Sequence, residues 1–162
     1  MYLIPSIASW DSGYHWAFIT SSFLHFHWLH ALLNLRFLWY FGPIVEGVVG
    51  PKRFFLYYLL SATSAGLISW LGNVKLEGND WAGAGASGPL FGLIGILLAL
   101  KLRWGMFHGP NEKQLAKTAT LILVGGFLLK LTPYDIIDNW GHLGGLFGGF
   151  CLAWFSPRPQ GH

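Results

Sequence analysis

Two polar residues stand at the entrances of two apolar segments. Ser87 lies in the glycine-rich stretch GAGASGPLFG (83–92), and His142 lies in NWGHLGG (139–145). A serine hydroxyl is a weak nucleophile until a base takes its proton, and a neutral imidazole suits that role near neutral pH. Because polar groups kept inside a bilayer usually belong to a functional site, this pair predicts a nucleophile and its base working within a membrane.

Candidate donors for an oxyanion occur in a third apolar segment. His30 and Asn34 are four residues apart and therefore share one face of a helix, and His25 lies five residues before His30, nearer the outer surface. The backbone N–H of Ser87 is expected at a helix start, where it has no intrahelical acceptor. Acyl transfer requires donors of this kind, although His30 and Asn34 could instead join two helices by hydrogen bonds.

A carboxylate to complete a triad is not evident near the pair. Asp138 precedes His142 by four residues and could reach it along one helical face, but we expect Asp138 in an outer loop. We therefore favour a Ser–His dyad. Phe91, one turn after Ser87, is interpreted from its position alone as a packing residue.

The composition is that of an integral membrane protein. Of 162 residues, 53% are hydrophobic and only 10% are charged, whereas soluble domains carry about 25% charged residues. A net charge of +3 is too small to indicate nucleic-acid binding. The single cysteine, Cys151, allows no internal disulfide, and the absence of a Cys/His cluster predicts no metal site.

The apolar segments predict an all-α multi-pass bundle that forms one domain over residues 1–162. Residues 1–17 are expected to form an outer interfacial loop, followed by five spans at about 18–41, 54–72, 83–100, 116–131 and 140–156. Lys and Arg gather in one set of loops, which predicts a cytoplasmic location for that set. Ser87 and His142 then enter from the outer face, and a water-filled cavity open to that side is needed to reach them.

Glycine spacing predicts how the two helices meet. Gly141, Gly145 and Gly149 recur every four residues on the last segment, and Gly88 and Gly92 do so on the third. Small residues at this spacing let membrane helices approach to backbone contact. The Ser87 and His142 helices are therefore expected to be neighbours.

Taken in order, these motifs resemble the rhomboid family of intramembrane serine proteases. The resemblance runs from about Trp16 to the end of the last segment, and it rests on His25 with His30-x-x-x-Asn34, Gly42-x-x-x-Glu46, Gly85-x-Ser87-Gly88 and Gly141-His142-x-x-Gly145-x-x-x-Gly149. Each motif alone is weak, but the ordered set is specific.

The resemblance implies a role for each residue. Ser87 would be the nucleophile and His142 the general base and then acid, while His30, Asn34 and the Ser87 N–H would stabilise the oxyanion. Gly85 would give the loop room beside the site. The resemblance further implies cleavage of transmembrane proteins in or near the bilayer, without metal or other cofactor, in a bacterial-type plasma membrane.

Three further expectations follow from the resemblance. Phe91 occupies the position where many members have a tyrosine beneath the catalytic imidazole, and His25 is a supporting residue of the site. The family core has six helices, and the segments of this chain match the last five, so the first is expected to be absent. The alternative function is a catalytically inactive rhomboid-like protein that binds membrane helices; a channel or transporter ranks third.

Overall fold

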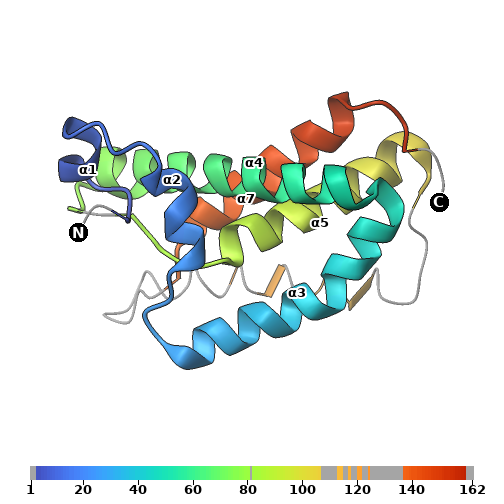
Figure 1. The fold of residues 1–162 in the computed structure, drawn as a ribbon, viewed down its shortest axis with the longest axis horizontal. Coiled ribbons are helices and arrows are strands. Elements are labelled where there is room, and N and C mark those ends of the chain that lie inside the picture. The colour runs from blue at the N-terminus through green and yellow to red at the C-terminus, as the bar shows by residue number, and fades with distance from the viewer. Residues whose placement is uncertain are drawn as a thin grey trace.

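The protein is a bundle of helices (Figure 1). The structure is a computed structural model that describes residues 3–80, 82–106, 113–114, 117, 120–121, 124 and 137–159. Its elements are α1 (Ile7–Asp11), α2 (Ala17–Thr20), the 3₁₀ turn η1 (Ser21–Phe23), α3 (Trp28–Val49), α4 (Pro51–Ser69), the π-helical turn η2 (Trp70–Leu76), α5 (Ser87–Trp104) and α7 (Asn139–Phe155).

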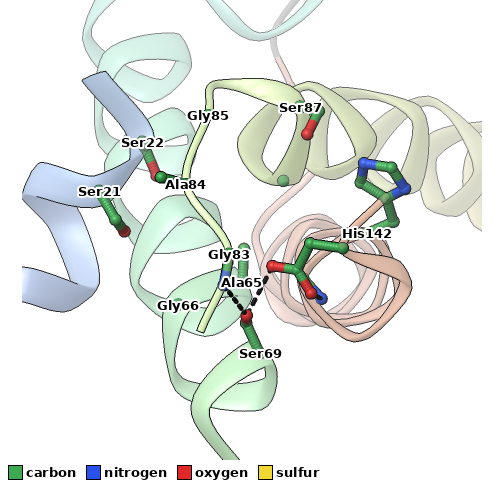
Figure 2. Close-up of a pocket in the computed structure, with 13 residues that line it drawn as sticks. Ser21, Ser22, Ala65, Gly66, Ser69, Gly83, Ala84, Gly85, Ser87 and His142 are labelled. Atoms are coloured by element: carbon green, nitrogen blue, oxygen red, sulfur yellow. Dashed lines mark hydrogen bonds between the residues drawn. The ribbon is translucent and has the colours of Figure 1, made fainter. Parts of the chain in front are cut away.

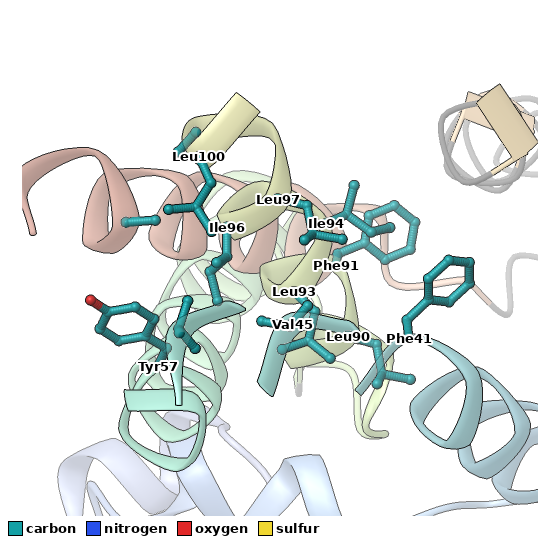
Figure 3. Close-up of a cluster of buried hydrophobic side chains, with 13 residues drawn as sticks. Phe41, Val45, Tyr57, Leu90, Phe91, Leu93, Ile94, Ile96, Leu97 and Leu100 are labelled. Atoms are coloured by element: carbon teal, nitrogen blue, oxygen red, sulfur yellow. The ribbon is translucent and has the colours of Figure 1, made fainter. Parts of the chain in front are cut away.

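Helix α5 is the central element, because α4 and α7 pack along it and α3 crosses it (Figure 1). About two thirds of its apolar span is buried. Leu93 and Ile96 have no exposed surface and form the middle of the main core (Figure 3). Phe41 and Val45 from the second half of α3 complete this core. The position of a residue at the start of α5 is therefore fixed by the packing of this helix.

Glycines bring α5 and α7 to backbone contact, as their spacing predicts. A Cβ atom added at Gly145 would collide with the carbonyl oxygen of Gly88, and one added at Gly149 would collide with that of Gly92. A second glycine face on α7 meets α4, where the Ser64 hydroxyl donates to the Gly144 carbonyl at 2.8 Å. The predicted neighbourhood of the two helices is confirmed, whereas the α4 face was not foreseen.

The first long helix begins later than predicted. The expected span of 18–41 is replaced by α2, η1 and an extended segment, and α3 then runs from residue 28 to residue 49. Leu24 and His27 have extended backbone angles, with ψ of 142° and 135°, which separate the short turns from α3. Apolar side chains (Phe23, Leu24, Phe26 and Trp28) occur on both sides of this boundary, so the apolar pattern did not mark the helix start.

The other helices lie close to the predicted segments. Segment 54–72 corresponds to α4 and η2, segment 83–100 corresponds to α5, and segment 140–156 corresponds to α7. The predicted segment 116–131 falls mostly outside the described residues. Three helical stretches of the described chain are long and apolar enough to cross a membrane: Trp28–Val49, Pro51–Leu76 and Ser87–Trp104. A helical membrane bundle is confirmed, and the count of five spans remains a prediction.

Candidate active site

Ser87 is the first residue of α5 and follows a loop, residues 82–86, that we call the serine loop. The helix start leaves backbone N–H groups without intrahelical acceptors. Within the described part of the chain, the N–H of Ser87 has no hydrogen-bond acceptor. Because the helix dipole also favours negative charge here, this N–H is suited to an oxyanion.

His142 lies in the first turn of α7, with only 4% of its surface exposed. Its ring stacks on Phe91 at 4.4 Å between centroids and 16° between planes. Its Nδ1 atom is buried and has no hydrogen-bond partner in the structure as described. Phe91 thus lies against the face of the imidazole, where the family resemblance implied an aromatic ring.

The two candidate catalytic side chains line one small cavity (Figure 2). The cavity has a volume of about 20 Å³. About 10–15 Å³ of such volume is needed for one water molecule, so the cavity has room for roughly one. Its polar walls come from Ser21, Ser22, Ser69, Ser87, Asp138 and His142.

No hydrogen bond joins the Ser87 hydroxyl to His142 in the part of the chain that the structure describes. The two groups start neighbouring helices and open into the same cavity (Figure 2). Hydrogen bonds between catalytic groups are often long in unliganded enzymes and tighten when substrate binds. Ser87 and His142 are therefore neighbours in this site without a direct hydrogen bond between them.

Four hydrogen bonds anchor the serine loop. The first runs from the N–H of Ala82 to the Pro5 carbonyl at 2.8 Å. The N–H of Gly83 donates to Ser69 Oγ at 3.1 Å, that of Gly85 donates to the Ser21 carbonyl at 2.9 Å, and that of Ala86 approaches an imidazole nitrogen of His25 at 3.4 Å. Gly85 has φ of +135°, which side chains rarely allow, and a Cβ there would also press on the His30 ring. Gly85 therefore leaves the space beside the serine loop that the His30 ring occupies, and the role that the resemblance implied for it stays a prediction.

The predicted oxyanion residues gather on the other side of the same loop. The rings of His25 and His30 meet edge to face at 5.2 Å, and Asn34 Nδ2 lies 2.9 Å from His25 Nε2. His25 precedes α3 and so is not on the helix that carries the other two. Since the Asn34 amide has two N–H donors, one remains available when the other binds His25.

Asp138 does not extend the pair to a triad. Its side chain caps α7 by accepting from the Gly141 N–H at 2.9 Å and also binds Ser69 and Asn73. Ser69 and Asn73 were missed in the sequence. Their polar side chains four residues apart within an apolar helix were the signal that could have found them.

The described residues contain no group of three or more His, Cys, Asp or Glu side chains able to hold a metal ion. His25 and His30 lie together, but Asn34 and the serine loop are their neighbours. The chemistry available from these residues is nucleophilic attack by a hydroxyl, proton transfer through an imidazole and hydrogen bonding to a developing negative charge.

Comparison with known proteins decides the family. The model of the rhomboid domain matches residues 12–159. This chain belongs to the rhomboid family. It is 32% identical over 149 residues to the putative rhomboid protease YdcA of Bacillus subtilis, covering 92% of this chain and 71% of that protein.

Two further relatives show the breadth of the match. Rhomboid protease GluP of Bacillus subtilis is 32% identical over 144 residues, covering 87% of this chain and 26% of that protein. Rhomboid-like protein 11, chloroplastic, of Arabidopsis thaliana is 29% identical over 152 residues, covering 94% of this chain and 48% of that protein. This rhomboid chain thus spans about half or less of those two relatives. Family membership and its apolar helices make it an integral membrane protein.

Proposed function

We propose that this rhomboid is an intramembrane serine endopeptidase that cuts transmembrane-helix substrates in or near the bilayer. The observation that supports it most is that Ser87 and His142 line one cavity, at the starts of two helices in glycine contact. Relatives whose names include rhomboid protease add family-level support. The site is proposed to open to the outer face of a bacterial plasma membrane.

The proposed reaction uses these groups in sequence. Ser87 Oγ attacks the scissile carbonyl while His142 takes its proton, and the oxyanion is stabilised by the Ser87 N–H together with His30 and Asn34. His142 then gives the proton to the leaving amine. Water enters the cavity and hydrolyses the acyl-enzyme, with His142 again as the base.

The test is labelling of the detergent-solubilised chain with a fluorophosphonate, which reacts with activated serines. We expect the wild type to be labelled and S87A and H142A to lose labelling altogether. S64A is the matched control, because Ser64 donates to a carbonyl between α4 and α7 and does not line the cavity. It should label as the wild type does.

One observation favours the alternative of an inactive, helix-binding rhomboid-like protein. The Ser87 hydroxyl and His142 are not hydrogen-bonded in the described structure. If the folded wild type fails to label and also fails to cut a membrane substrate, while capturing it intact, the protease proposal is wrong and the alternative stands.

A further inference from the structure

A polar cluster lies beside the Ser87–His142 pair, where the end of α4 meets the start of α7. It consists of Ser69, Asn73 and Asp138, which are brought together across 65 to 69 residues of sequence. Ser69 is 1% exposed, and both Ser69 and Asp138 line the cavity that contains the pair. The proposed reaction assigns no step to these residues.

The Asp138 carboxylate accepts hydrogen bonds from two elements at once. Oδ1 accepts from the Gly141 N–H at 2.9 Å and from Asn73 Nδ2 at 2.9 Å, and Oδ2 accepts from Ser69 Oγ at 2.5 Å. Hydrogen bonds to an ionised acceptor are shorter and stronger than those between neutral groups. One carboxylate thus fixes the first turn of α7 to the end of α4.

Ser69 extends this link to the serine loop. While its hydroxyl donates to Asp138, its oxygen accepts from the Gly83 N–H at 3.1 Å (Figure 2). The same oxygen also accepts from Asn73 Nδ2 at 3.1 Å. A Cβ added at Gly83 would collide with the Asp138 carboxylate itself. The loop that leads into Ser87 is therefore both bonded to and packed on this network.

The cluster connects the two segments whose separation matters for catalysis. Gly83 precedes Ser87 by four residues, and the His142 N–H donates to the Asp138 carbonyl at 3.0 Å, one helical turn away. Because the Ser87 hydroxyl and His142 share no hydrogen bond, their spacing depends on the α5–α7 glycine contact and on what holds these two segments. A misplacement of about 1 Å in reacting groups can lower a rate by about 100-fold.

We infer that Asp138 is a positioning residue that sets the spacing of Ser87 and His142 by holding the serine loop, through Ser69, and the first turn of α7 on one carboxylate. This inference rests on the proposed protease function. Asp138 touches neither the substrate nor the reacting atoms in this role. It acts through the two segments that carry them.

Replacement by asparagine separates this role from helix capping. Asparagine caps helices about as well as aspartate, so D138N keeps the bond to the Gly141 N–H. The amide nitrogen of the new asparagine cannot accept a hydrogen bond from the Ser69 hydroxyl. Ser69 Oγ would then be surrounded by three N–H donors, those of Gly83, Asn73 and the new amide, and the hydroxyl hydrogen of Ser69 would have no acceptor. D138N should therefore free the serine loop while α7 remains capped.

The experiment compares the wild type with D138N, S69A and the double variant. The readouts are the rate constant of fluorophosphonate labelling, kcat and KM on a membrane substrate, and Tm. W140F is the matched control, because the Trp140 indole N–H donates to Glu77 at 2.7 Å, joining α7 to the residue after η2 without reaching the loop.

We expect D138N and S69A each to lower the labelling rate and kcat by about 10- to 100-fold, with KM unchanged. The double variant should be no slower than the slower single variant, because both changes break one link. W140F should label at the wild-type rate, and the Tm of D138N should match that of W140F.

Three results would overturn the inference. These are a D138N rate equal to that of the wild type, losses in the single variants that multiply in the double variant, and rate losses in all four variants that simply follow Tm. A folded wild type that never labels would instead overturn the protease proposal, and the positioning role with it. Labelling of the wild type separates the two failures.

Discussion

The orientation of the His142 ring depends on an aromatic face. The ring is stacked 4.4 Å from Phe91, while its Nδ1 atom has no partner within the described residues. In a triad a carboxylate would bind that atom, but here the nearby Asp138 is engaged by Ser69, Asn73 and the α7 cap. Stacking must then do the orienting that a third catalytic residue would otherwise do.

Removal of the Phe91 ring should slow the reaction of Ser87. Aromatic pairs are worth about 0.5–1.5 kcal/mol beyond their buried area, so F91A should lower the fluorophosphonate labelling rate by up to about 10-fold. F91Y keeps the ring and should label within about twofold of the wild type. If F91A labels at the full rate, another contact orients His142.

At the scale of elements, α7 positions the base through two glycine faces. Gly145 and Gly149 meet the α5 backbone, and Gly144 and Gly148 meet Ser64 on α4. The approach leaves no room for a side chain, so the spacing of the helices is fixed by their backbones. This close approach also places the first turn of α7, which contains His142, beside the Ser87 end of α5.

A single methyl group at this contact should disturb both stability and activity. G145A would press on the Gly88 carbonyl, one residue from Ser87, and overpacking of this kind costs about 1–3 kcal/mol. We expect a lower Tm in detergent and a loss of labelling.

The matched control is G47A in α3, where an added Cβ meets nothing within 4 Å. Alanine is favoured over glycine in a helix by about 0.5–1 kcal/mol, so its Tm should be unchanged or slightly higher. Equal Tm values for G145A and G47A would show that α5 and α7 can move apart enough to accommodate a methyl group at little cost in stability.

At the scale of the molecule, apolar exposure and charge are arranged as a bilayer requires. Large side chains remain exposed along the helices, including Trp28, Leu35 and Trp39 on α3 and Phe147 and Phe155 on α7. At one end, Arg53 and Arg103 donate to carbonyls of Pro157 and Ser156 at 3.3 and 3.2 Å. Basic residues at that end favour a cytoplasmic location for it.

The proposed orientation can be tested with single cysteines. In a C151S background, D80C lies beyond η2 near the serine loop, and K52C lies at the opposite end of α4; both positions are exposed. A membrane-impermeant maleimide applied to intact cells should label D80C and leave K52C unlabelled until the cells are permeabilised. The reverse pattern would place the site on the cytoplasmic side.

The sequence alone determined the candidate catalytic pair and the main helix contact. Ser87 and His142 were identifiable because a hydroxyl and an imidazole at the entrances of apolar segments are rare, and the four-residue glycine spacing indicated the α5–α7 contact. These are local patterns, readable within a few turns of one helix. The predicted start of the first span was wrong because apolar side chains such as Leu24 and Phe26 also occur in the extended residues before α3.

Only the tertiary structure decided how the site is held together. Ser69 and Asp138 are 69 residues apart, and their hydrogen bond exists because α4 and α7 pack side by side. The same packing placed His142 against Phe91, and the fold of residues 21–25 put His25 against Asn34 and the serine loop. The periodicity of a sequence shows which residues share one face of a helix. Contacts between helices depend on which of these faces meet, and only the packing of the tertiary structure decides that.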